Sequence, residues 1–173
     1  MTFLPKGYEQ PKTGGGHMKL QKGENRIRIV WSPIVGYVDR DKSGNKPRPV
    51  RTKEKQQSLN QWEKPKHFWA MVVVDRTDDS VKVLEVTQAT IQNAIFSLAE
   101  DADRGNPKEY DIVIGRTWEG LDTKYTVTPK PVEKLSKELL GLVESTKINL
   151  DALYDGGDPF EIDEIDTDPE FGS

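Results

Sequence analysis

Residues 67–98, with the sequence HFWAMVVVDRTDDSVKVLEVTQATIQNAIFSL, decide the fold class. The first part, residues 67–75, is rich in aromatic and β-branched side chains, which favours a β-strand. The polar residues 77–80 then predict a turn, and the composition of residues 81–86 predicts a returning strand. The two strands are therefore expected to form an antiparallel hairpin.

A helix is expected directly after this hairpin, beginning at Thr87 or Gln88. Its apolar residues recur at the spacing of one helical face, at Ile91, Ala94, Ile95 and Leu98. The run Gly105-Asn106-Pro107 is a stop signal, so the helix is expected to end before it.

A second hairpin and a bent first strand complete the predicted sheet. Residues 110–114 and 124–128 have strand composition on either side of a turn near Glu119-Gly120. Residues 26–38 alternate like a half-buried strand that bends at Pro33. Five strands with one helix between the third and the fourth have the order of an oligonucleotide/oligosaccharide-binding (OB) barrel. The sequence therefore predicts a mainly β fold, a five-stranded OB barrel with the order β-β-β-α-β-β, and leaves an α+β sheet as the alternative.

Four segments are expected along the chain. Residues 1–23 are rich in Pro and Gly and predict an arm that is either wrapped on the body or loose from it. Residues 24–130 form the OB domain, and residues 131–147 have the apolar spacing of an amphipathic helix. Residues 148–173 are expected to be a disordered acidic tail, with order ending near Gly156-Gly157.

Charge is segregated along the chain, although the formal net charge is only −4. All 25 Lys and Arg residues precede residue 148, where they stand against 20 acidic residues. Residues 148–173 hold nine acids and no base. A basic body with an acidic appendage suggests a nucleic-acid-binding protein, although a solvated body with a solubilising tail has the same charge pattern.

The positive charge is concentrated in a long polar connection predicted over residues 39–66. Within residues 40–66, nine bases stand against three acids. In an OB barrel this connection borders the binding face, and Lys and Arg suit sequence-independent contact with phosphates. The candidate phosphate contacts are Arg40, Lys42, Lys46, Arg48, Arg51, Lys53, Lys55, Lys64 and Lys66, with Arg26 and Arg28 extending the basic track from the first strand.

Aromatic residues flank and interrupt the basic connection. Nucleic-acid bases stack on aromatic rings regardless of sequence, for ~1–3 kcal/mol each. Because adjacent strand residues face opposite ways, a buried Phe68 turns Trp69 and Met71 toward the ligand, and the reverse assignment makes Trp69 a core residue. The candidate stacking residues are Tyr37, Trp62, Trp69 and Trp118.

The composition gives no indication of catalysis. The chain has no cysteine, and its two histidines, His17 and His67, lie far apart, so neither a metal site nor a thiol nucleophile is expected. Without a nucleophile motif, neither enzymatic activity nor a cofactor is expected. No apolar run approaches the ~20 residues of a membrane helix and the N-terminus lacks the pattern of a secretion signal, so a cytoplasmic location is expected.

The acidic tail carries apolar residues that a purely solvating tail does not need. Phe160, Ile162 and Ile165 interrupt its acids. Acidic segments with spaced hydrophobic residues suit docking into basic, apolar grooves on partner proteins. These three residues are therefore the candidate partner-binding residues.

Several stretches of the sequence carry a resemblance to a known family. They are FLPKGYEQPKTGGGHMKLQKGENRIRIV (3–30), KHFWAMVVVD (66–75), VLEVTQATIQNAI (83–95) and PKEYDIVIGRTWEGLDTKYTVTP (107–129). Together they resemble bacteriophage single-stranded DNA-binding proteins of the OB-fold type, over roughly residues 3–130. The resemblance implies a protein that coats single-stranded DNA during phage replication or recombination in the bacterial host cytoplasm. It also implies that the tail recruits replication proteins.

The features above combine into one hypothesis and leave two alternatives open. The hypothesis is sequence-independent binding of single-stranded DNA, with cations on the phosphates and aromatic rings on the bases. One alternative is a protein-interaction adaptor that acts through the acidic tail and the helix at residues 131–145. The other is binding of single-stranded RNA, since charge and aromatic content are the same for both ligands.

Overall fold

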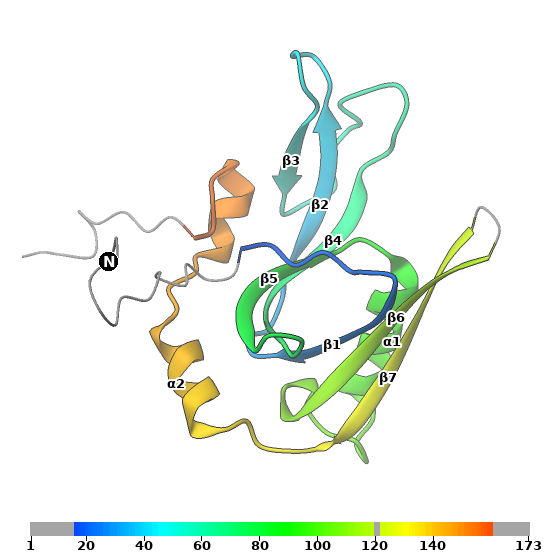
Figure 1. Ribbon diagram of the computed structural model, residues 1–173. Coiled ribbons are helices and arrows are strands. Elements are labelled where there is room, and N and C mark those ends of the chain that lie inside the picture. The colour runs from blue at the N-terminus through cyan, green and yellow to red at the C-terminus, as the bar shows by residue number, and fades with distance from the viewer. Residues whose placement is uncertain (1–15, 120–121, 161–173) are drawn as a thin grey trace, which may run out of the picture.

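The computed structural model describes residues 16–119 and 122–160, which form one curved antiparallel sheet with few helices (Figure 1). The strands are β1 (Gly23–Ile29), β2 (Ile34–Asp41), β3 (Arg48–Thr52), β4 (Lys66–Asp75), β5 (Ser80–Val86), β6 (Tyr110–Glu119) and β7 (Asp122–Val132). The helices are α1 (Ala89–Glu100) and α2 (Lys137–Ser145), with the short 3-10 helices η1 (Pro107–Glu109) and η2 (Leu150–Asp155). The mainly β class expected from the sequence is confirmed.

Strand β4 organises the sheet. One edge of β4 pairs with β5, and the other edge pairs first with β2 and then with β1. β1 ends where Ile29 pairs with Val73, and β2 begins where Ile34 pairs with Ala70. Pro33, which has no N–H to donate, lies in the gap between them. The long bent first strand of the prediction is therefore two strands that share one neighbour.

The hydrogen-bonded sheet is not closed into a ring. The strand order is β3-β2-β4-β1-β6-β7, with β5 on the remaining edge of β4. Among the described strands, β7 pairs only with β6 and β3 pairs only with β2. α1 packs against β7 and against the sheet interior. The strand and helix order agrees with the prediction, whereas a closed barrel is not present in the hydrogen-bond pattern.

One face of the sheet forms the main core with α1. Ile91 and Ile95, one turn apart on α1, are buried in one cluster with Met71 and Val73 of β4. The helix is therefore held by the apolar stripe that the sequence predicted. Its N-cap residue, Gln88, makes no side-chain capping hydrogen bond, so packing rather than capping fixes its start.

The opposite face of β4 and β5 is covered by residues 137–160, which we call the C-terminal cover. Val72 and Val74 of β4 are fully buried in a cluster with Leu139 of α2 and Leu150 of η2. α2 begins at a Ser136 cap, whose hydroxyl accepts from the Leu139 N–H at 3.2 Å. Both faces of β4 are therefore buried.

Order continues well beyond residue 148, where the disordered tail was expected to begin. Ile148, Leu150 and Leu153 are only 8%, 7% and 3% exposed. The Asn149 N–H donates to the Pro159 carbonyl at 2.8 Å, so the segment continues past Gly156-Gly157 as far as Phe160. The prediction followed the acidic charge of this segment and overlooked its apolar residues, which fill the outer face of the sheet. Residues 161–173 lie outside the described residues.

The predicted polar connection contains a strand that the sequence did not reveal. β3 pairs with β2 from Tyr37 to Asp41, and the resulting hairpin projects from the body (Figure 1). Pro49 lies opposite Arg40. Because β3 is an edge strand, a proline without an N–H is tolerated there. Composition did not predict this strand, because the two prolines and the basic residues of this stretch are not typical of strands.

The described part of the N-terminal arm is wrapped on the body. The Met18 N–H donates to the Val83 carbonyl at 2.8 Å, and the Val83 N–H donates to the Gly16 carbonyl at 3.1 Å. The Met18 side chain is buried in the main core. Residues 1–15 lie outside the described residues. Neither described helix combines the length and apolar composition needed to cross a membrane.

Candidate nucleic-acid interface

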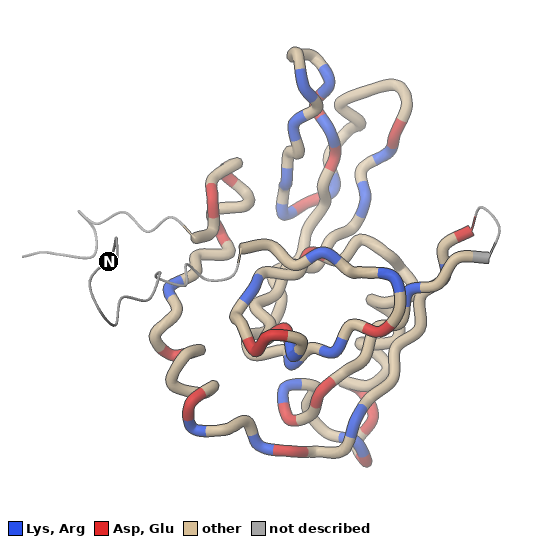
Figure 2. Tube along the Cα trace, in the orientation of Figure 1, with Lys and Arg blue, Asp and Glu red and all other residues tan. Residues whose placement is uncertain are grey.

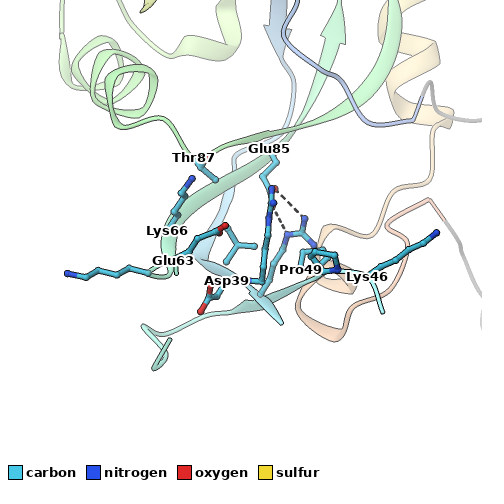
Figure 3. Close-up of a pocket in the computed structure, with 12 residues that line it drawn as sticks. Asp39, Lys46, Pro49, Glu63, Lys66, Glu85 and Thr87 are labelled. Atoms are coloured by element: carbon cyan, nitrogen blue, oxygen red, sulfur yellow. Dashed lines mark hydrogen bonds and ion pairs between the residues drawn. The ribbon is translucent and has the colours of Figure 1, made fainter. Parts of the chain in front are cut away.

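Lys and Arg residues gather on the projecting part of the molecule (Figure 2). This part, which we call the basic arm, consists of the β2–β3 hairpin and the following residues 53–66. A groove of about 630 Å³ runs between the arm and β5 (Figure 3). The groove is lined by Val38, Asp39, Arg40, Lys46, Pro47, Pro49, Arg51, Glu63, Lys64, Lys66, Glu85 and Thr87.

Most cations of the groove have no acidic partner. Within the described part of the chain, no carboxylate lies within ion-pair distance of Arg40, Lys46, Lys64 or Lys66. All four side chains belong to exposed residues. Their positive charge is therefore available to an anionic ligand.

The fifth cation of the groove anchors the arm to the body. Arg51 of β3 donates from Nε to Glu85 Oε2 at 2.5 Å and from Nη2 to Oε1 at 3.3 Å. The Arg51 side chain is only 15% exposed, so this two-point contact is largely shielded from solvent. Arg51 therefore fixes the position of the groove wall relative to β5.

A buried carboxylate shapes the loop that carries the groove's far wall. Asp39 accepts hydrogen bonds from the Leu59 N–H at 2.6 Å and from Asn60 Nδ2 at 3.2 Å. Asn60 Oδ1 in turn accepts from the N–H groups of Trp62 and Glu63, at 2.9 and 2.8 Å. Asp39 and Asn60 therefore hold residues 59–63 in place and set the position of Trp62.

Trp62 is the most exposed large hydrophobic residue among those that the structure describes, at 67%. The Lys42 Nζ atom lies 5.1 Å from the centroid of its ring and 3.2 Å from Glu63 Oε1. An exposed indole on the loop that borders a cationic groove offers the kind of surface on which bases stack. The sequence-based prediction of an exposed Trp62 is confirmed.

The turn of the β2–β3 hairpin is held by Asp41. Its Oδ1 accepts from the Ser43 hydroxyl at 2.6 Å and its Oδ2 pairs with Arg48 Nη2 at 3.1 Å. The pKa of Asp41 lies below its usual value, chiefly because of the hydrogen bond from the Ser43 hydroxyl. Arg48 remains 74% exposed, so its head is accessible from solvent. Lys55 is exposed on the segment after β3.

Tyr37 does not line the groove. Its neighbour Val38 does, and adjacent side chains on a strand point to opposite faces. The Tyr37 ring lies 5.3 Å from the ring of His67, whose Nδ1 is 2.9 Å from the Gly36 carbonyl oxygen. Tyr37 therefore lies on the other face of the arm.

Trp69 is a core residue rather than a ligand-facing one. It is half-buried and packs on the main cluster with Met71, while Phe68 is fully buried on the other face of β4. The sequence argument turned Trp69 outward because only one face of β4 was expected to be covered. The C-terminal cover packs on the face that carries Phe68, and α1 packs on the face that carries Trp69. Phe68 is therefore fully buried and Trp69 is half-buried.

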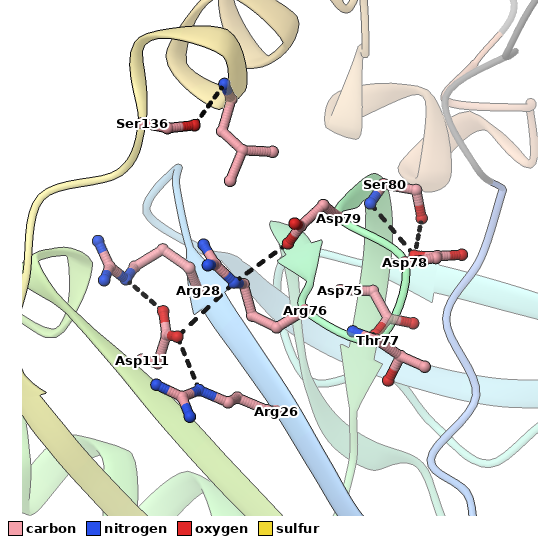
Figure 4. A network of polar contacts seen from close by, with 11 residues as sticks. Arg26, Arg28, Asp75, Arg76, Thr77, Asp78, Asp79, Ser80, Asp111 and Ser136 are labelled. Carbon is pink, nitrogen blue, oxygen red and sulfur yellow. Dashed lines mark hydrogen bonds and ion pairs between the residues drawn. The ribbon is translucent and has the colours of Figure 1, made fainter.

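Arg26 and Arg28 do not extend the basic arm. Arg28 is buried, and its Nε lies 2.9 Å from Asp111 Oδ1, with both side chains less than 5% exposed (Figure 4). Arg26 Nε lies 2.8 Å from Asp111 Oδ2, and Arg76 Nε lies 3.7 Å from the same oxygen. Arg28 pairs opposite Val74, near the far end of β4 from Lys66. At ~3.3 Å per residue, this cluster lies about 25–30 Å along the strand from the groove.

Trp118 forms a separate aromatic site on the β6–β7 hairpin. It is 45% exposed, and two cations lie over its ring, with Lys22 Nζ at 5.1 Å and the Arg116 guanidinium carbon at 4.9 Å from the centroid. Arg116 is held in place because its Nη1 donates to the Leu20 carbonyl at 2.7 Å. Trp118 is therefore accessible, as base stacking requires, at a site apart from the residues that line the groove.

Two aromatic residues of the C-terminal cover have positions that the sequence did not indicate. Phe160 packs on the apolar cluster of the cover and meets the His17 ring edge-on, with centroids 5.4 Å apart. It is therefore part of the body rather than of a free docking tail, and Ile162 and Ile165 lie outside the described residues. Tyr154 of η2 lies beside Lys53, at the edge of the basic arm.

Within residues 16–119 and 122–160, no three side chains among His, Asp and Glu are grouped to hold a metal ion. Asp75 and Asp78, at the β4–β5 turn, both pair with Lys82 Nζ, at 2.8 and 3.4 Å. The hydrogen bond that Lys82 donates to Asp75 is the main reason that the pKa of Lys82 is raised.

Comparison with known proteins gives one informative relative. No family model matches the chain, and no solved structure matches it. The chain is 31% identical, over 147 residues, to a protein of Escherichia phage T5 named "Probable ssDNA-binding protein". The match covers 66% of this chain and 57% of the phage protein, so the chain spans less than two thirds of that relative's length. The likeness to bacteriophage single-stranded DNA-binding proteins that the sequence indicated is thereby confirmed.

Proposed function

We propose that this protein binds single-stranded DNA without strong sequence preference and that the groove of the basic arm is its main binding site. The observation that carries the proposal is the combination of four unpaired groove cations with the exposed ring of Trp62. Cations at the groove neutralise phosphates, while the indole offers a face on which any base stacks. The name of the phage T5 relative supports the same ligand.

The proposal also includes the assignment of the sheet to the OB class. The sheet is a member of the OB class whose barrel is open between its end strands, with α1 inserted between the third and fourth strands of the five-strand pattern. In this class the connection after the first strand and the hairpin of the last two strands border the ligand. The basic arm and the Trp118 hairpin occupy these two positions in the chain order, which supports a DNA path that touches both.

The proposal extends to a biological setting, which the phage origin of the relative supports. The protein coats and protects single-stranded DNA during phage DNA replication or recombination, in the cytoplasm of a bacterial host. It acts by binding rather than by catalysis, in agreement with the name of the relative. The supporting observation within the chain is the set of Lys and Arg side chains that line the groove, with the exposed Trp62 ring next to the lining residue Glu63. Phosphate contacts and base stacking of this kind are tolerant of sequence.

A titration of the wild-type protein and of Trp62→Ala with labelled oligothymidylate tests the proposal. Four phosphate contacts on a single strand imply that wild-type affinity falls about 50-fold between about 50 and 200 mM salt. Loss of one stacking ring implies that Trp62→Ala binds about 5- to 150-fold more weakly at either salt concentration. Fluorescence anisotropy of the labelled strand measures both quantities.

The same titration includes two comparison ligands and one control variant. A duplex of equal length should bind more weakly than the single strand, and an RNA strand of matched sequence settles the DNA-against-RNA alternative. Phe96→Ala removes a 58% exposed ring from α1, outside the groove, and should leave DNA affinity unchanged. Undetectable or salt-independent binding by the wild-type protein would contradict the proposed function.

The acidic residues 161–173 recruit replication or recombination proteins in this proposal, through Ile162 and Ile165. Their sequence supports it, because spaced apolar residues among acids suit docking into basic grooves. Deleting residues 161–173, while keeping Phe160 and the C-terminal cover, should abolish partner capture and leave single-stranded DNA affinity equal to or above that of the full chain. Persistent partner capture after the deletion would refute recruitment through residues 161–173. A loss of DNA affinity would instead show that these residues contribute to DNA binding.

A further inference from the structure

Three aromatic rings of the described chain each lie near a lysine ammonium group. Lys42 Nζ lies 5.1 Å from the Trp62 centroid, and Lys22 Nζ lies 5.1 Å from the Trp118 centroid. The third pair is Tyr154 with Lys53, whose Nζ lies 5.4 Å from the ring centroid. The first two rings were expected at a nucleic-acid interface from the sequence. The third belongs to a segment that was expected to be an acidic tail.

Tyr154 is held in a fixed orientation on the body. Its hydroxyl donates to the Val35 carbonyl at 2.6 Å, and its ring lies 6.2 Å from the buried ring of Phe68 at an angle of 54°. Burial raises the pKa of the Tyr154 hydroxyl, so it remains a protonated donor at neutral pH. Tyr154 is only partly buried. A rigid ring with part of its surface in solvent loses little conformational entropy when a base stacks on it.

The Tyr154–Lys53 pair is continuous with the groove. η2 packs against β3, the strand that forms one wall of the groove. Phe68 links the two sites, because its ring lies 6.0 Å from the Arg51 guanidinium and 6.2 Å from the Tyr154 ring. Lys53 follows β3 directly, two residues after Arg51, and has no acidic partner within the described residues.

We propose that Tyr154 and Lys53 form an additional stacking site for a nucleic-acid base, so that the C-terminal cover contributes directly to the single-stranded DNA interface. This inference rests on the proposed function of the groove. A solvent-exposed cation–π contact is weaker than a base stacked on an aromatic ring. A base therefore displaces the Lys53 ammonium from the ring, and the lysine transfers to the adjacent phosphate.

Photochemical crosslinking of the full chain tests the contact itself. An oligothymidylate in which thymine is replaced by 5-iodouracil is irradiated in complex with the wild-type protein, and crosslinked peptides are mapped by mass spectrometry. We expect crosslinks at both Trp62 and Tyr154. Crosslinks at Trp62 without any at Tyr154 would overturn this inference and leave the groove intact as a site. The absence of any complex would instead overturn the proposed function.

Two substitutions separate stacking from a structural role of the ring. Tyr154→Phe keeps the ring and removes the hydrogen bond to Val35, whereas Tyr154→Leu keeps apolar bulk and removes the ring. We expect Tyr154→Phe to bind oligothymidylate within about 2-fold of the wild type and Tyr154→Leu to bind about 5-fold or more weakly. Urea unfolding measures the free energy of unfolding of both variants. Phe96→Leu is the matched control, because it replaces an aromatic ring by leucine on α1. Equal affinity of Tyr154→Leu and the wild type would refute the stacking site, as would an affinity loss that follows stability across both variants.

Discussion

Replacing Arg40, Lys46, Lys64 and Lys66 together by Gln lowers the affinity for single-stranded DNA on the order of 10³-fold at about 50 mM salt. Each lost phosphate contact on a single strand reduces the slope of log affinity against log salt by about 0.7, so the slope falls by about 2.8 in total. The four side chains have no acidic partner among the residues that the structure describes, so their removal leaves no described acid buried without its counter-charge. Anisotropy titrations over a series of salt concentrations measure both the affinity and the slope.

A control variant with the same change in net charge distinguishes direct phosphate contacts in the groove from the electrostatic field of the whole protein. Lys108, Lys134, Lys137 and Lys147 are exposed and lie outside the residues that line the groove. Replacing these four by Gln changes the net charge by the same amount. We expect this control to retain most of the wild-type affinity and slope, because distant charges are screened beyond a Debye length of about 10 Å at 0.1 M salt. Equal losses in both quadruple variants would show that the groove is not the binding site.

Asp111→Ala is expected to destabilise the protein by about 3–5 kcal/mol, because it removes one partner of a buried ion pair. Asp111 and Arg28 are 3% and 4% exposed, so the substitution leaves a guanidinium buried without its counter-charge. Arg26 and Arg76 lose the same carboxylate, but they are more exposed and remain partly hydrated. Urea unfolding followed by circular dichroism measures the change in the free energy of unfolding.

Two further variants test whether the loss of stability in Asp111→Ala comes from the buried ion pair. Asp79→Asn removes the charge of a half-exposed carboxylate that pairs with Arg76, and asparagine tolerates the left-handed backbone at this position (φ 52°). A surface pair of this kind contributes about 0–1 kcal/mol. The double variant Arg28→Met/Asp111→Leu removes both buried charges and should recover most of the stability. A loss below about 1 kcal/mol for Asp111→Ala would contradict the view that burial makes this pair critical.

The β4–β5 hairpin and α1 could be predicted because local sequence determines them. Their apolar residues recur at the strand and helix periods, and the turn at residues 77–80 is polar. β3 could not be predicted in this way. Its residues Arg48–Thr52 gain their strand conformation from pairing with β2, and an edge position tolerates the proline that argues against a strand elsewhere.

The orientation of Trp69 required knowledge of what covers each face of β4. Alternation alone places Phe68 and Trp69 on opposite faces and predicts that one of them is exposed. The structure buries Phe68 under Leu153 of the C-terminal cover and packs Trp69 on the main core with α1. The decisive contact joins residues more than 80 positions apart, which a local pattern does not contain.

The candidate site, like the fold, has some features that could be predicted from the sequence and others that could not. The concentration of cations in residues 40–66 and the exposure of Trp62 follow from composition, since a polar loop leaves its long side chains in solvent. The support of Trp62 by Asp39 and Asn60 depends on hydrogen bonds across about 20 residues of chain, which no local sequence pattern indicates. Arg28 was predicted as a DNA contact because Asp111, 83 residues away, was not known to lie beside it.

The position of the C-terminal cover has a consequence for the order of events during synthesis. The apolar residues on this face of β4 and β5 are synthesised within the first half of the chain, and they are Val72, Val74, Val81 and Val83. The residues that bury them extend from Leu139 to Phe160. A nascent chain that has already formed β4 and β5 therefore keeps an apolar face in water until residue 160 has left the ribosome. Such a face invites association with other nascent chains or with chaperones. Messages truncated between β7 and η2 should accordingly yield aggregated products, even though every strand of the sheet has been made.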